Sequence, residues 1–247
     1  MKVALLVTCL IDAYRPSAAR ATVRLLERAG CQVAVPVQAC CGQTAFNAGD
    51  REAAKAVARP MIAAFEGFDA VVAPSGSCAG MAARHWPDLF ADDPPWAERA
   101  RAVAARTHEL TAFLVDVLKR PDVVSPVAGP VAYHDSCSSL RDCAVFAQPR
   151  ALLAAAGAQV SEVADPQACC GFGGLFCLPH PDVSGAIAGK KTAALAATGA
   201  EVVLAGDLGC LLNIAGKARR EGRAFQVRHI AEALAGDLSA PPIGADR

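Results

Sequence analysis

The chain has 247 residues, of which 53% are hydrophobic and 19% charged, so it can bury a substantial core and is not disordered. The 24 Lys and Arg residues balance the 24 Asp and Glu residues, which argues against nucleic acid or an anionic membrane surface as the main partner. Eleven cysteines in a chain of this size do not resemble a small secreted disulfide scaffold, and a reducing cytoplasm is the expected location.

The N-terminal apolar segment has two interpretations. Lys2 precedes an apolar run over residues 3–11, and residues 19–21 follow it as Ala-Arg-Ala, which faintly resembles a secretory signal peptide. A buried first strand is favoured, because the run contains Cys9 and a similar run precedes Cys137. No apolar stretch reaches the roughly 18 residues that a membrane-spanning helix requires.

The first half alternates predicted strands and helices. Residues 3–7 form the continuous apolar run of a strand buried on both faces, and further strands are expected at 33–37 and 70–73. Pro36 cannot donate a ladder hydrogen bond, which places the second strand at a sheet edge. Helices are predicted at 16–29, 50–65 (bent or divided at Pro60), 96–106 and 111–118.

The second half repeats this order. Strands are predicted at 131–134, 160–163 and 202–205, and helices at 149–156 and 183–197. The segment 227–230 corresponds to 107–110 of the first half. His108 and His229 are therefore expected as paired structural positions. The pattern predicts an α/β fold of two similar halves from an internal repeat, each half a small parallel sheet flanked by helices. Its predicted parts are residues 1–122, residues 128–236 and a flexible tail at 237–247.

Eight of the eleven cysteines fall into two matching sets around a repeated Cys-Cys-Gly tripeptide at 40–42 and 169–171. One cysteine lies 31 or 32 positions before each tripeptide, and another lies 37 or 40 positions after its second cysteine. All of them follow predicted strands, where ligands of parallel sheets bind. We therefore predict a metal site in each half, with the ligand sets Cys9, Cys40, Cys41, Cys78 and Cys137, Cys169, Cys170, Cys210.

Four thiolates suit either a tetrahedral zinc ion or an iron–sulfur cluster. Zinc ligands are usually separated by two to four residues, and adjacent cysteines strain a single ion, so iron–sulfur is favoured. Zinc, thiol–disulfide chemistry and plain buried cysteine remain open. Gly42 and Gly171 lack side chains, so their backbone can approach a cofactor and aim N–H groups at sulfur.

The motifs as a set resemble the cysteine-rich CCG-domain family over residues 1–235. This family includes the B subunit of heterodisulfide reductase, the iron–sulfur subunit of glycolate oxidase and short two-repeat members of lactate-utilisation systems. The segments that carry the resemblance are 7–9, 40–43, 74–80, 134–137, 169–174 and 206–210.

The resemblance implies two iron–sulfur clusters, of four-iron or non-cubane type, in an electron-transfer subunit of an L-lactate oxidation complex. Other iron–sulfur and accessory proteins would be its partners, and no catalytic residue is assigned. In the heterodisulfide reductase branch the last motif carries an additional cysteine, where this chain has Ser75 and Asp207. These two residues are expected near the cofactor, as oxygen ligands or, preferably, in supporting or helix-capping roles. A disulfide reductase-type or glycolate-type subunit, and a structural zinc protein or scaffold, are the alternatives.

Other residues carry weaker expectations. Cys31, Cys143 and Cys177 have no counterpart in the opposite half and are predicted as small core residues. His134 and Asp135 precede Cys137, where a proton relay is possible and a local hydrogen bond that holds the loop is favoured.

Overall fold

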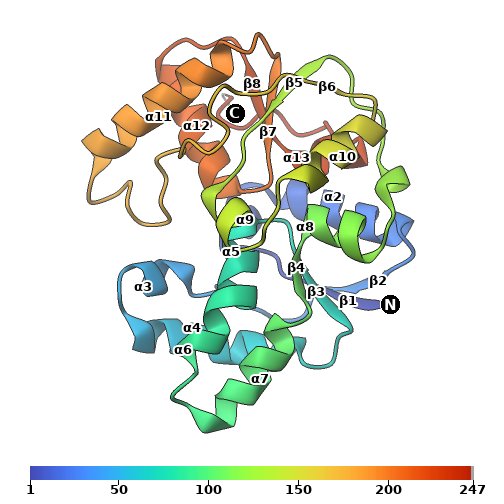
Figure 1. The fold of residues 1–247 in the computed structure, drawn as a ribbon, viewed down its shortest axis with the longest axis vertical. Helices are drawn as coiled ribbons and strands as arrows, with labels where there is room; N and C mark the ends of the chain where they lie inside the picture. Colours follow the sequence, from blue (N-terminus) through green and yellow to red (C-terminus); the bar gives the residue numbers. More distant parts are fainter. Residues whose placement is uncertain (246–247) are drawn as a thin grey trace.

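Two four-stranded parallel sheets organise the chain, one in each half (Figure 1). In this computed structural model, which describes residues 1–245, the strand orders are β2-β1-β3-β4 and β6-β5-β7-β8. Equivalent strands occupy equivalent places, which confirms the predicted α/β fold with an internal repeat. The strands are β1 (Lys2–Leu5), β2 (Gln32–Ala34), β3 (Ala70–Ala73), β4 (Thr107–Glu109), β5 (Pro130–Tyr133), β6 (Gln159–Val160), β7 (Val202–Ala205) and β8 (Gln226–His229).

Helices follow nearly every strand. Those of the first half are α1 (Cys9–Tyr14), α2 (Pro16–Arg28), α3 (Gln43–Asn47), α4 (Arg51–Phe65), α5 (Gly76–Gly80), α6 (Trp86–Leu89), α7 (Pro94–Ala104) and α8 (Leu110–Ala112), with π-helical turns η1 (Met81–His85) and η2 (Phe113–Val117). After the 3-10 turn η3 (Pro121–Val123) come α9 (Cys137–Arg141), α10 (Ala147–Ala155), α11 (Pro181–Ala196), α12 (Leu208–Arg220) and α13 (Ile230–Ala235). Strand β2 ends before Pro36 and lies at the sheet edge, as predicted, whereas α4 continues past Pro60 without division.

Side chains alternate between the two faces of each sheet, because successive strand residues point in opposite directions. In the first sheet, Ala4 and Val71 belong to an outer core with α4, α6 and α7. Val3 and Val72 point the other way, into a core that also contains residues of the second half. The second sheet has its own outer core with α11 and α12.

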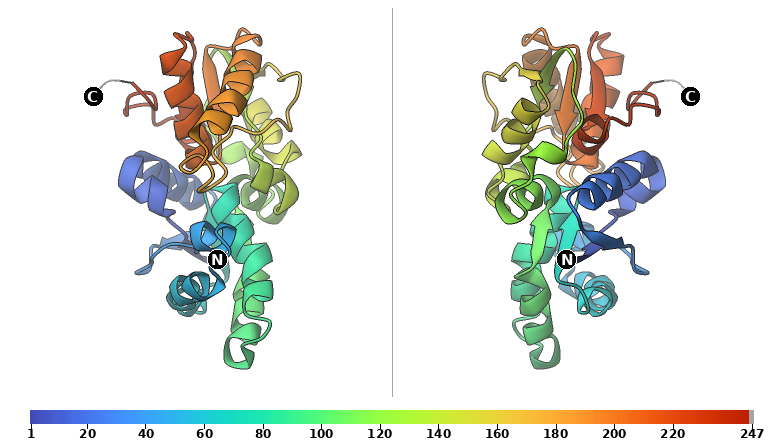
Figure 2. Two further views of the ribbon diagram at one scale, coloured as in Figure 1. Left: turned by 90° about the vertical axis from the view of Figure 1, so that its left-hand side faces the viewer. Right: turned by 90° about the vertical axis from the view of Figure 1, so that its right-hand side faces the viewer.

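The central core joins the two halves. Helix α2 of the first half packs on α13 of the second, and α10 of the second half packs on α8 of the first (Figures 1 and 2). Helices α2 and α10 both follow the first strand of a half, and α8 and α13 both follow the last. The halves therefore contact each other through equivalent helices, as in a two-fold symmetric dimer, although both belong to one chain.

Strand register corrects one sequence-based pairing. Ala73 pairs with Glu109 in the first sheet, and Ala205 pairs with His229 in the second, so Glu109 and not His108 is the counterpart of His229. Both residues cap the helix that follows. The Glu109 carboxylate accepts from the backbone of α8, and the His229 ring accepts from the Ala231 N–H.

The predicted tail makes specific contacts within the described residues. The Pro241 carbonyl accepts a hydrogen bond from Arg15, the Ile243 N–H donates to the Val227 carbonyl at 2.8 Å, and Ile243 is buried. Residues 246–247 of the predicted tail lie outside the described residues. From residue 1 to 245, no helix combines the length and apolar character that crossing a bilayer takes.

One buried ion pair crosses between the halves and allows a test. Arg15 binds the Glu232 carboxylate at two points, 2.7 and 2.9 Å, and Glu232 is inaccessible to solvent. We expect Arg15→Ala to lower the free energy of unfolding by about 3–5 kcal/mol, because it leaves a buried carboxylate without its cation.

Urea denaturation followed by circular dichroism measures this loss. The control is Arg120→Ala, which removes an equally bidentate but exposed pair with Asp122 and should cost less than about 1 kcal/mol. Equal losses of unfolding free energy in the two variants would contradict the expectation that the buried pair matters more for stability than the exposed pair.

Candidate metal centre

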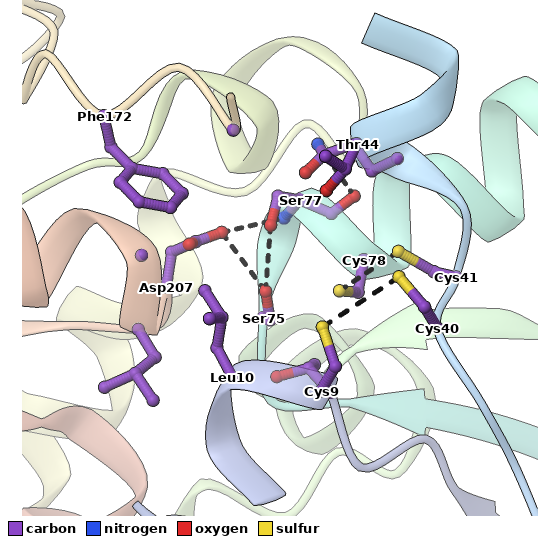
Figure 3. A pocket seen from close by; sticks show the side chains of 15 residues that line it. Cys9, Leu10, Cys40, Cys41, Thr44, Ser75, Ser77, Cys78, Phe172 and Asp207 are labelled. Carbon is purple, nitrogen blue, oxygen red and sulfur yellow. Dashed lines mark hydrogen bonds between the residues drawn. The ribbon is translucent and has the colours of Figure 1, made fainter. Parts of the chain in front are cut away.

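The four repeated thiols of the first half converge at the carboxyl ends of β1, β2 and β3 (Figure 3). Cys9 opens α1, Cys40 and Cys41 follow β2, and Cys78 lies in α5. The Sγ atoms of Cys9 and Cys40 are 3.9 Å apart, and those of Cys41 and Cys78 are 3.3 Å apart. All four are free thiols, beside a cavity of about 100 Å³. We call this group the first site.

The second half builds the same arrangement. Cys137 opens α9, Cys169 and Cys170 follow β6, and Cys210 lies in α12. The Sγ atoms of Cys170 and Cys210 and one ring nitrogen of His134 all lie within 4.8 Å of one another. A cavity of about 120 Å³ adjoins these thiols. We call this group, with its four cysteines, the second site.

Helix caps place the first cysteine of each site. The hydroxyl of Thr8 accepts a hydrogen bond from the Ile11 N–H, and the hydroxyl of Ser136 accepts one from the Ser139 N–H. Each cap starts a short helix at the next residue, Cys9 or Cys137. The upstream cysteine is thereby fixed as the first residue of a helix.

The glycine of each tripeptide has a steric and an electrostatic role. Gly42 has φ 91° and Gly171 has φ 86°, a left-handed conformation that favours glycine. A Cβ atom on Gly171 would lie 2.6 Å from the Ser184 carbonyl oxygen. The Gly42 N–H donates to Cys40 Sγ at 3.4 Å, and the Gly171 N–H donates to Cys169 Sγ at 3.3 Å. The Phe172 N–H also donates to Cys170 Sγ at 3.4 Å, so the backbone stabilises negative charge on one sulfur of the first site and on two of the second.

Hydrogen bonds between the thiols favour the ionised form of one cysteine in each site. Hydrogen bonds from Cys41 and Cys9 lower the pKa of Cys40 to about 2, with help from the Gly42 N–H. Hydrogen bonds from Cys137 and Cys170 lower the pKa of Cys169 to about 2 in the same way. The pKa of a donor thiol shifts in the opposite direction: the hydrogen bond with Cys40, and then burial, raise the pKa of Cys9. Each set of four thiols is therefore already polarised, as a thiolate metal centre requires.

Ser75 and Asp207 contact each other across the boundary between the halves. Both occupy the N-cap position of the helix that carries the last cysteine, yet neither caps its own helix with its side chain. Instead, the Asp207 carboxylate accepts from the Ser77 N–H at 3.0 Å and from the Ser75 hydroxyl at 3.2 Å (Figure 3). Asp207 of the second half therefore caps α5 of the first.

The two cavities share several lining residues, so the two sites are neighbours. Phe172 lies beside Asp207 in the view of the first cavity (Figure 3) and also lines the second. A Cβ atom on Gly209 would lie 2.4 Å from the Phe172 ring, so a glycine is needed there. The shared lining residues are Gln43, Ser77, Phe172, Gly174 and Asp207. Sequence comparison of the halves missed the roles of Ser77 and Phe172, because these residues serve the contact between the repeats.

Other expectations had mixed outcomes. The carboxylate of Asp135 forms a bidentate pair with Arg150 at 2.9 Å, which holds the loop. The prediction that the His134 side chain forms a local hydrogen bond is wrong, because within the described residues neither ring nitrogen has a hydrogen-bond partner. Cys31 lies in the central core as predicted, and Cys143 is half-buried against the first outer core. Cys177 is also half-buried, outside the three cores of the described chain.

Comparison with known proteins agrees with this geometry. The family model of the cysteine-rich domain CCG matches the chain twice, over residues 3–82 and 131–215, and these ranges contain all eight repeated cysteines. The chain therefore belongs to the CCG cysteine-rich domain family, as the motifs predicted.

Particular relatives are similar over nearly the whole chain. Lactate utilization protein A of Bacillus cytotoxicus is 44% identical over 236 residues, which cover 95% of this chain and 98% of that protein. Lactate utilization protein A of Bacillus thuringiensis (strain Al Hakam) and of Bacillus cereus (strain AH187) match with the same identity and coverage.

Thiol polarisation can be tested on the reduced, metal-free chain. At pH 6 an ordinary thiol is roughly 0.3% thiolate, whereas Cys40 and Cys169 remain ionised because their pKa values are depressed. We expect iodoacetamide to modify these two at least about tenfold faster than Cys9 and Cys137. Peptide mass spectrometry over time measures the order of modification.

The first site makes the test discriminating, because solvent exposure alone gives the opposite order there: Cys9 is exposed and Cys40 is only half-exposed. Buried Cys31, whose pKa is raised by burial, is the slow internal control. Faster modification of Cys9 than of Cys40 would overturn the assignment.

Proposed function

We propose that this chain is an iron–sulfur electron-transfer subunit of an L-lactate-oxidising system. The observation that carries the proposal is the pair of four-thiol sites, at the carboxyl ends of two parallel sheets, in a chain 44% identical to Lactate utilization protein A. The proposed ligands are Cys9, Cys40, Cys41, Cys78 for one cluster and Cys137, Cys169, Cys170, Cys210 for the other. An iron–sulfur cluster bound there supplies one-electron storage and release.

The adjacent cysteines support a group with several metal atoms. The Sγ atoms of the first site form a chain of contacts, in which Cys40 lies between Cys9 and Cys41, and Cys41 lies between Cys40 and Cys78. Directly adjacent ligands strain a single small ion but can reach different iron atoms of a cluster. Gly42 and Gly171 supply N–H donors to sulfur, and Ser75 and Asp207 hold the two sites together from the boundary between the halves.

The cavity walls support electron transfer in preference to chemistry on lactate. Lactate carries a carboxylate, which proteins commonly bind with arginine or lysine. Among the described residues, neither cavity is lined by either residue. We therefore assign the removal of hydrogen from lactate to a partner protein, and we propose other iron–sulfur and accessory subunits as the partners.

Two alternatives remain distinct. A disulfide reductase-type or glycolate-type subunit would use the same clusters with another substrate, so activity with a disulfide but not with lactate and partner subunits favours it. A structural zinc protein would use the same cysteines without redox chemistry. The eleven free thiols of the chain support work in a reducing compartment, which we propose is the cytoplasm.

Metal analysis tests the proposal directly. We expect anaerobic reconstitution with iron and sulfide to give a coloured protein that contains both iron and acid-labile sulfide. Cys41→Ser and Cys170→Ser should each lose about half of the iron, because each removes a thiolate from one site only. Iron and sulfide per chain are the measured quantities.

The matched control is Cys177→Ser, which changes a half-buried cysteine outside both ligand sets and should retain the full iron content. A colourless protein that binds one zinc ion per site would contradict the electron-transfer function.

A further inference from the structure

The two sites have equivalent thiols but different surroundings. Leu6 and His134 each follow the first strand of a half, and their N–H groups donate to the equivalent carbonyls of Val72 and Leu204. They therefore occupy the same place in the repeat. Leu6 is fully buried and apolar, whereas its counterpart is a buried histidine.

The two halves also differ at a second pair of equivalent positions. Gly42 packs against the Ala54 carbonyl of α4, and Gly171 packs against the Ser184 carbonyl of α11, which fixes the equivalence of these helices. Seven residues further along each helix, the first half has Met61 and the second half has Lys191. Met61 is fully buried, and Lys191 is only 1% exposed.

His134 has a free donor at the second site. Its ring nitrogens are buried without a hydrogen-bond partner in the described chain, and one lies within 4.8 Å of the Cys170 and Cys210 Sγ atoms. A histidine ring carries at least one N–H in either protonation state, and leaving that N–H unbonded in the interior costs free energy. A sulfur-rich anionic group between these thiols would accept that bond.

Lys191 has a buried charge without a matching carboxylate. Its ammonium donates to the Asp165 carbonyl at 3.4 Å, which is a neutral partner. The carboxylates of Asp135 and Asp165 act on it most strongly, followed by the ligand sulfurs of Cys170 and Cys210, and Asp135 is already bound to Arg150. The buried ammonium therefore lies near the ligand sulfurs of the second site, where added negative charge would be stabilised.

We propose that His134 and Lys191 make the cluster of the second site the higher-potential one of the pair, so that electrons pass from the first site to the second. This inference rests on the proposed function. Reduction adds one negative charge to a cluster, and an N–H donor and a buried cation stabilise that charge. At the equivalent places in the first half, Leu6 and Met61 supply neither a side-chain N–H nor a charge. In the step, one electron leaves the reduced first cluster and enters the oxidised second cluster, without bond cleavage.

Redox titration of the full-length, anaerobically reconstituted chain, followed by electron paramagnetic resonance, tests the proposal. Cys41→Ser identifies the signal of the second site, and Cys170→Ser that of the first. His134→Leu and Lys191→Met introduce side chains that this fold already accommodates at the equivalent places in the first half. We expect each to shift the midpoint potential of the second cluster to a more negative value and to leave the first unchanged.

Conservative variants separate this tuning from a structural role. His134→Gln keeps an N–H donor and Lys191→Arg keeps the charge, so both should retain a potential closer to that of the unmodified chain. Met61→Leu is the control in the first site and should move neither potential. A higher potential at the first site, or an unshifted second potential in His134→Leu and Lys191→Met, would overturn the inference. Failure of the unmodified chain to take up iron and sulfide would instead overturn the proposed function.

Discussion

Packing of α2 on α13 and of α8 on α10 determines how the two halves meet. Each half contributes one helix to each pair, so neither half can bury its inner sheet face without the other. The bidentate pair between Arg15 and Glu232 lies within this contact, where loss of either partner would leave the other charge buried and unpaired. With the sheets held in this way, the cysteine-bearing loops of both halves lie on either side of one boundary.

The contact between α5 and α9 shows how closely the loops approach. A Cβ atom on Gly76 would lie 1.9 Å from the Ser139 hydroxyl oxygen, and one on Gly80 would lie 2.7 Å from the Asp142 side chain. Small residues after β3 therefore allow the helix of Cys78 to reach the helix of Cys137. The two thiol sites are neighbours because the glycines of α5 let the Ser139 and Asp142 side chains of this contact pack directly against its backbone.

Much of this arrangement could be predicted from local pattern. Apolar strands, their order and the cysteines after them follow from periodicity and from the rule that ligands bind at the carboxyl ends of parallel strands. The contact of Asp207 with Ser77 could not be predicted, because it joins residues 130 positions apart across a packing arrangement that no local pattern encodes. The burial of Lys191 could not be predicted either, since a charged residue in an alanine-rich helix is normally placed on its solvent face. Only alignment of the two helices by structure reveals that Lys191 occupies the place of Met61.

The hydrogen bond between Ser75 and Asp207 has a consequence for the duplicated chain as a whole. Equivalent positions in the two halves contact each other, and the bond exists because one is a hydroxyl and the other a carboxylate. Two copies of the second half, assembled in the same way, would bring two carboxylates together in a buried place, where like charges repel. Fusion of the repeats into one polypeptide allows the two positions to differ, and this pair of side chains makes each half a specific partner for the other and a poor partner for itself.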